Sequence, residues 1–105
     1  MIRIVPKYKL LMSYDIKPES QEVYYRFVTT DFVPALRLMH IYMTDVHHTL
    51  WGNYPVRLVE FVAESKEVIQ EALESERYKQ LEEKLKTYTE NYSRKVIRYR
   101  DGFQM

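Results

Sequence analysis

The chain has 105 residues and a nearly balanced charge, with 16 basic and 15 acidic side chains and a formal net charge of +1. Such a balance gives no electrostatic attraction toward nucleic acid or an anionic membrane. No apolar run reaches the roughly 18 residues of a membrane span. The absence of cysteine excludes disulfides and thiol chemistry. We therefore expect one cytoplasmic domain over residues 1–105, with flexible ends at residues 1–7 and 101–105, that binds neither nucleic acid nor membrane.

The first elements along the chain are predicted to be a strand and a long helix. Apolar and polar side chains alternate over residues 9–15, which is typical of a strand. Over residues 19–38, apolar and aromatic side chains recur at helical spacing. Within this helix, Asp31 can cap a new turn that has Pro34 as its third residue, so we expect a kink or a restart at Thr30–Asp31.

A hairpin is predicted next, from a strand at residues 44–51 and a second strand at residues 56–63. Gly52 and Asn53 are expected to supply the positive φ values of its turn. The second of these strands is apolar on both faces. One face carries Val56, Leu58, Glu60 and Val62, and the other carries Arg57, Val59, Phe61 and Ala63. Both faces are therefore expected to be covered.

Two further helices and a last strand complete the pattern. Ser65 can cap a short helix, and Ser75 can cap a longer one. The apolar stripe predicted for the longer helix consists of Tyr78, Leu81, Leu85, Tyr88 and Tyr92. Residues 92–100 are predicted to form the last strand.

The resulting order, βαββαβ, predicts an α+β fold with one four-stranded antiparallel sheet and both helical regions on one face. The other sheet face then has no cover within the chain, and large exposed apolar patches are rare on monomers. Two copies packed sheet to sheet would bury this face. We therefore expect a homodimer with a barrel-like arrangement of the two sheets.

Three local stretches carry a family resemblance: residues 32–36 (FVPAL), 51–55 (WGNYP) and 75–78 (SERY). With the element order and the tail at residues 102–104, they make the chain resemble an uncharacterised bacterial branch of the dimeric α/β-barrel superfamily. That superfamily has a ferredoxin-like fold and includes antibiotic-biosynthesis monooxygenases, EthD-like, NIPSNAP-like and muconolactone-isomerase-like proteins. The resemblance implies a cofactor-independent monooxygenase or isomerase that acts on a small aromatic or polyketide-like compound. Two alternatives stay open: a non-catalytic module that binds a small hydrophobic ligand, and a structural homodimer.

The strand at residues 44–51 is the most polar of the four and predicts the position of a pocket, between the helices and the sheet near the end of this strand. Neighbouring strand residues point to opposite faces, so His47 and His48 cannot share one site easily. Because the apolar Val46 lies on the face of His48, we expect His48 to point inward and His47 to point toward the rim or solvent.

Five residues are predicted to form the site. His48 and Tyr14 are the catalytic candidates, since an imidazole exchanges protons near neutral pH. Trp51, Tyr24 and Glu60 are the candidates for ligand binding. The competing interpretation is structural, with tyrosine rings packed in the core and their hydroxyls at the surface.

Glu60 requires a partner because it shares its strand face with apolar residues. Arg57, Arg98 and His48 are the candidates, and an interface ion pair is the structural alternative to a titratable group in a pocket.

No metal site and no cofactor are expected. Asp45 and His47 share a face two residues apart, but no zinc-site spacing accompanies them. The polar stripe to which they belong is also consistent with a solvated or rim-facing strand. No glycine-rich phosphate loop, nucleophile elbow or dinucleotide fingerprint is present, and no residue pattern requires a flavin or haem.

Overall fold

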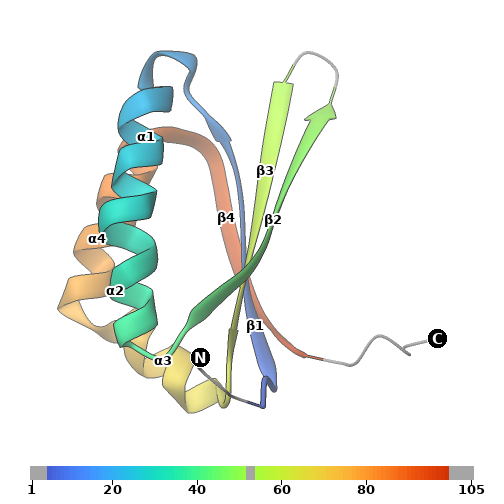
Figure 1. Ribbon diagram of the computed structural model, residues 1–105, viewed down its shortest axis with the longest axis vertical. Helices are drawn as coiled ribbons and strands as arrows, with labels where there is room; N and C mark the ends of the chain where they lie inside the picture. Colours follow the sequence, from blue (N-terminus) through green and yellow to red (C-terminus); the bar gives the residue numbers. More distant parts are fainter. Residues whose placement is uncertain (1–4, 52–53, 100–105) are drawn as a thin grey trace.

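The computed structural model describes residues 5–51 and 54–99, with the backbone alone for residues 49–51, 54 and 55. In chain order the elements are β1 (Tyr8–Ile16), a 3-10 turn (Pro18–Ser20), α1 (Gln21–Phe27), a π-helical turn (Val28–Phe32), α2 (Val33–Leu38), β2 (Tyr42–Trp51), β3 (Tyr54–Ala63), α3 (Lys66–Glu74), α4 (Glu76–Thr87) and β4 (Thr89–Arg98). The strands form one antiparallel sheet in the order β2-β3-β1-β4, and the helices lie on one side of it (Figure 1). The predicted α+β architecture is therefore confirmed.

The ends of the described segments adjoin the sheet. Lys7 donates its backbone N–H to the carbonyl of Ala63 at 2.9 Å and accepts from the N–H of Tyr99 at 2.7 Å. The remaining predicted ends, residues 1–4 and 101–105, lie outside the described residues, as does the predicted turn at Gly52–Asn53. None of the helices in the described part of the chain has the length and apolar character needed to cross a membrane.

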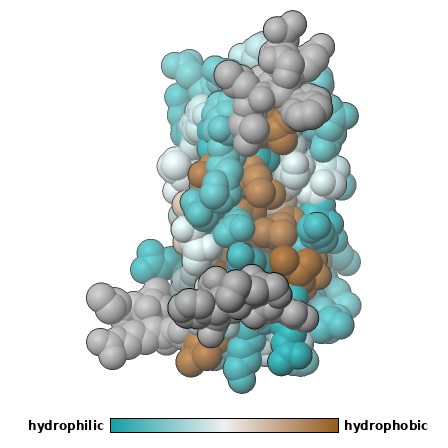
Figure 2. Space-filling view, turned by 90° about the vertical axis from the view of Figure 1, so that its right-hand side faces the viewer, coloured by the Kyte–Doolittle hydropathy of each residue, from teal (hydrophilic) through white to brown (hydrophobic). Residues whose placement is uncertain are grey.

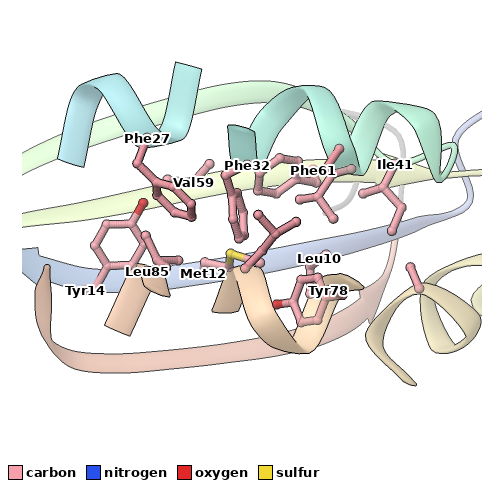
Figure 3. Packing of buried hydrophobic residues seen from close by; sticks show 14 of the residues in the cluster. Leu10, Met12, Tyr14, Phe27, Phe32, Ile41, Val59, Phe61, Tyr78 and Leu85 are labelled. Atoms are coloured by element: carbon pink, nitrogen blue, oxygen red, sulfur yellow. The ribbon is translucent and has the colours of Figure 1, made fainter. Parts of the chain in front are cut away.

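The core lies between the helices and one face of the sheet. Strand β1 supplies its centre with Leu10, Met12, Tyr14 and Ile16, which are 0–8% exposed. Phe32 packs against the rings of Phe27, Phe61 and Tyr78, with centroid separations of 5.9–6.2 Å (Figure 3). Aromatic rings in tilted and edge contacts therefore fill much of the space between the two layers.

The first helical region is irregular where the sequence predicted a kink, but the form of the irregularity differs. A π-helical turn joins α1 to α2, and Asp31 does not cap a new helix, because the residue before α2 keeps helical backbone angles. The hydroxyls of Thr29 and Thr30 donate back to the carbonyls of Tyr25 and Arg26, at 2.8 and 2.7 Å. Such back-bonding satisfies carbonyls at the end of α1, just before the widened turn, so the chain continues as a helix.

The two predicted serine caps are confirmed. The Oγ of Ser65 accepts from the N–H of Val68, and the Oγ of Ser75 accepts from the N–H of Tyr78, both at 3.1 Å. The predicted stripe ran past the end of the longer helix, since α4 ends at Thr87. Tyr88 is the residue that follows the helix, and Tyr92 belongs to β4.

The face of the sheet opposite the helices carries a stripe of apolar side chains in its centre, bordered by polar ones (Figure 2). The register places Leu11 of β1 opposite Glu60 and Lys95, and Ser13 opposite Leu58 and Ser93. We call this surface the open face. Its apolar members include Leu11, Leu58, Val62 and Ile97.

Candidate functional site

A β-bulge in β2 determines which side chains reach each face. The register with β3 shifts between Met43 and Asp45, after which Asp45 lies opposite Glu60 and His48 lies opposite Arg57. The extra residue moves every later side chain of β2 to the other face. His48 therefore faces the helix side and His47 the open face, which is the orientation predicted from Val46.

On the helix side, His48, Arg57 and Tyr14 form a row across β2, β3 and β1, since Arg57 is the register partner of both others. Helix α1 adds two tyrosines above this row. The hydroxyls of Tyr14 and Tyr24 hydrogen-bond at 2.5 Å, and an Nη of Arg57 donates to the hydroxyl of Tyr25. We call these five residues the Arg57 site.

The guanidinium of Arg57 lies against two aromatic rings of α1. Its centre lies 5.0 Å from the ring centroid of Tyr25 and 5.8 Å from that of Tyr24, within cation–π range. Its Nε is buried and has no hydrogen-bond partner among the described residues. A buried N–H donor without a partner destabilises the folded protein. Binding of a ligand oxygen or a water molecule to this N–H would therefore be favourable.

The two buried tyrosines of the site are neutral hydrogen-bonding groups. Burial raises the pKa of Tyr14 above that of an ordinary phenol, and the neighbouring Tyr24 raises it further. Burial likewise raises the pKa of Tyr24, against the opposing effects of its hydrogen bond with Tyr14 and the charge of Arg57. Neither phenol is therefore a proton acceptor at neutral pH. In the structure, their hydrogen bond links α1 to β1, and the ring of Tyr24 lies against the guanidinium of Arg57.

The structure brings together only part of the predicted site. His48, Tyr14 and Tyr24 belong to the Arg57 site, but His48 is exposed and lines none of the described cavities. Glu60 lies on the open face, where its Oε1 is 3.5 Å from the Nζ of Lys9. Lys9 thus takes the place expected for Arg57, Arg98 or His48. The side chain of Trp51 lies outside the described residues.

A second polar cluster, missed by sequence reasoning, ties α4 to β4. One oxygen of Glu82 accepts from Tyr92 at 2.7 Å, from Arg94 at 2.8 Å and from Tyr78 at 2.9 Å. Burial raises the pKa of Tyr78 to about 12. The ring of Tyr92 also stacks on that of Tyr14, with a centroid separation of 6.1 Å and an interplanar angle of 13°. The cluster therefore contacts the Arg57 site through the stacked rings of Tyr92 and Tyr14.

The open face is also hollowed near its centre. The hollow has a volume of about 350 Å³, and its lining is Leu11, Ser13, Leu58, Ser93, Arg94 and Lys95. Small serines beside aliphatic side chains leave room for groups of another surface to enter. Three other hollows of about 270–300 Å³ lie around the ends of α2, α3 and α4.

Neither a protein-family model nor a curated protein matches the chain. Several solved structures do. A NIPSNAP family protein from Agrobacterium tumefaciens is 12% identical and superposes with a TM-score of 0.68, covering 97% of this chain and 93% of its own. An uncharacterised NIPSNAP domain protein from Burkholderia xenovorans is 8% identical, with a TM-score of 0.66 over 93% of this chain and 98% of its own. A dimeric ferredoxin-like protein from an uncultured marine organism is 16% identical, with a TM-score of 0.62 over 96% and 94%.

At such identities the likeness establishes the fold. The chain has the ferredoxin-like α+β fold that these NIPSNAP structures share, which confirms the predicted resemblance at that level. Because one fold of this kind can serve many unrelated functions, function has to be argued from the surfaces and sites described above.

Proposed function

We propose that the protein works as a structural homodimer whose two sheets pack through their open faces. The observation that carries this proposal is the apolar stripe on a sheet face without helices (Figure 2). Leu11 and Leu58 are only partly buried there, and Ile97 is 38% exposed. Removing these side chains from water would stabilise an association by roughly 25 cal/mol per Å² of buried apolar area.

Several features of the open face favour a second copy as its cover. A two-fold axis makes one surface complementary to itself, so the stripe of one protomer meets the same stripe of its partner. Ser13 and Ser93 in the central hollow allow the two sheets to approach closely. Lys95 and the Lys9–Glu60 pair lie on the same face, so this face does not carry charge of one sign alone, which would oppose the approach of a second copy. The dimeric ferredoxin-like protein of the same fold supports this choice.

Light scattering after size exclusion tests the assembly. The protein should elute with about twice its chain mass of 12.8 kDa. Leu58→Asp, which places a charge in the stripe, should produce a folded monomer. The matched control is Val23→Asp, because Val23 is 44% exposed on α1 and away from the open face. A wild-type monomer at micromolar concentration, or a Leu58→Asp variant that remains dimeric, would refute the proposal.

A second candidate function is binding of a small aromatic anion at the Arg57 site. The buried, unpartnered Nε of Arg57 favours it, because a guanidinium pairs well with carboxylate or phenolate oxygens. The cofactor-independent isomerase or monooxygenase activity implied by the resemblance would use the same place. There, His48 would remove a proton from a phenolic or carbon acid, and Arg57 would stabilise the resulting anion. In an isomerisation the imidazolium would return that proton to another carbon.

Calorimetric titration with 2-naphthoate tests this second candidate. Arg57→Met keeps the length of the side chain and should weaken binding at least about tenfold, as expected for the loss of a charge-assisted hydrogen bond. The control is Arg98→Met on β4, where Arg98 lies opposite Tyr8. Absence of heat with the wild type, or equal affinity of the Arg57→Met variant, would remove this candidate and leave the homodimer unaffected.

A further inference from the structure

Three potential metal ligands meet on the open face, near the β2 edge of the sheet. The bulge in β2 brings Asp45 directly opposite Glu60 and places His47 two residues further on the same face. One ligand atom from each residue lies within 4.8 Å of the other two. The Nε2 of His47 is 3.2 Å from the Oδ2 of Asp45. This convergence is produced by the bulge, since without it Asp45 and His47 would point to the helix side.

The juxtaposition of Asp45 and Glu60 is unfavourable by itself. Like charges directly opposite each other in an antiparallel pair destabilise a sheet. A single cation, Lys9, accompanies them in the described structure, and its Nζ is 3.5 Å from Glu60. A divalent ion between the two carboxylates would neutralise both.

We propose that Asp45, His47 and Glu60 form a site for a divalent transition-metal ion such as Zn²⁺. One imidazole nitrogen and two carboxylate oxygens are accepted zinc ligands, and three protein ligands leave further positions for water. Bonds of about 2.1 Å place two ligands of one ion at most about 4.2 Å apart. The half-exposed side chains of Asp45 and His47 need only small rotations to close the remaining distance.

The neighbouring groups are compatible with ion binding. The Oδ1 of Asp45 accepts from the backbone N–H of Val46 at 2.9 Å, which leaves Oδ2 toward His47. Lys9 competes for Glu60, yet its Nζ also lies 5.1 Å from the ring centroid of Tyr99. The ammonium therefore keeps an aromatic partner when Glu60 turns to the ion. Because Lys9 must be displaced, we expect its removal to raise the affinity for the metal.

Calorimetric titration of chelator-treated protein with ZnCl₂ tests the proposal. Wild type should bind one ion per protomer. His47→Ala should weaken binding by at least about tenfold, since loss of even an outer-shell partner of a metal site costs this much. His48→Ala is the matched control, because His48 is the next residue and faces the opposite side of the sheet. Lys9→Met should bind more tightly than wild type.

Cobalt provides a spectroscopic readout that does not depend on stability. Co²⁺ added to wild type should produce a visible absorption band, which should disappear in His47→Ala and persist in His48→Ala. Far-ultraviolet circular dichroism of each variant checks that the fold is retained. Absence of binding to wild type, equal binding by His47→Ala, or equal loss in His48→Ala would each overturn the proposal.

Discussion

The side chains of β1 are buried to different degrees on the two faces of the sheet. Along β1, Leu10 and Met12 are almost completely buried under the helices, whereas their neighbours Leu11 and Ser13 on the open face are only partly buried. Polar groups follow the same division. On the helix side, Tyr14 and Tyr24 hydrogen-bond to each other within the core. On the open face, carboxylates stand opposite each other beside a hollow.

The helix side of the sheet contains the core that stabilises the fold, whereas the open face carries the groups for which we propose a partner or a ligand. Among the described residues, the Nε of Arg57 is the one buried side-chain polar atom without a hydrogen-bond partner, and it lies on the helix side. The open face leaves apolar area and like charges exposed, and neither benefits an isolated protomer. Features that cost stability in one protomer are the ones expected to have a partner or ligand. The predictions below follow this contrast, beginning with the largest expected effect.

The strongest contrast concerns two adjacent leucines of β1. Leu10→Ala should lower the free energy of unfolding by about 2–5 kcal/mol, because Leu10 is 0% exposed and its loss leaves a cavity. Leu11→Ala should lower it by less than about 1 kcal/mol at concentrations where the protomer is monomeric. Urea denaturation monitored by circular dichroism measures both. Equal losses would mean that the open face is packed as tightly as the core.

Alkaline pH should weaken the helix side selectively. Burial raises the pKa of Tyr78 to about 12, so folding favours its neutral form. Stability from this effect is present below the ordinary phenol pKa of about 10 and is lost as pH rises toward 12, by about 2–3 kcal/mol. Denaturation midpoints between pH 9 and 12 measure the loss. Tyr78→Phe should show a smaller fall, and an identical fall would assign the effect to other groups.

The hydroxyl pair of Tyr14 and Tyr24 should behave as one unit. Tyr14→Phe should cost about 1–2 kcal/mol, because it leaves the buried hydroxyl of Tyr24 without its partner. The double variant with Tyr24→Phe should cost less than the sum of the two single changes. A double-mutant cycle from urea denaturation measures this coupling. Strict additivity would show that each hydroxyl finds another partner.

On the open face, removal of a charged side chain should raise the free energy of unfolding instead of lowering it. Asp45→Asn relieves the repulsion with Glu60 and should raise the free energy of unfolding by a few tenths to about 1 kcal/mol in metal-free protein. Zn²⁺ at saturating concentration should reverse the order, since it stabilises only a protein that binds it. Thermal denaturation with and without the ion measures both effects. A destabilised Asp45→Asn variant without metal would contradict the proposed repulsion.

Local sequence patterns were sufficient for much of the fold. Alternation in β1 and the serines at positions 65 and 75 are short-range signals, and each was confirmed. The orientation of His48 followed from the apolar Val46 on its face. The break in the first helix was expected at Thr30–Asp31, but its π-helical form was not, because backbone carbonyls can be satisfied there in more than one way.

The sequence by itself determined the order of the elements, the alternation of faces in β1 and β3 and the open apolar surface, because periodicity and helix caps act over a few residues. Tertiary structure alone decided the partners of the charged groups. Arg57 met Tyr25 of α1, Glu60 met Lys9 of β1, and Glu82 joined α4 to β4. Such partners come from segments far apart in the chain. Their meeting depends on strand register, which one extra residue in β2 reversed for every side chain after it.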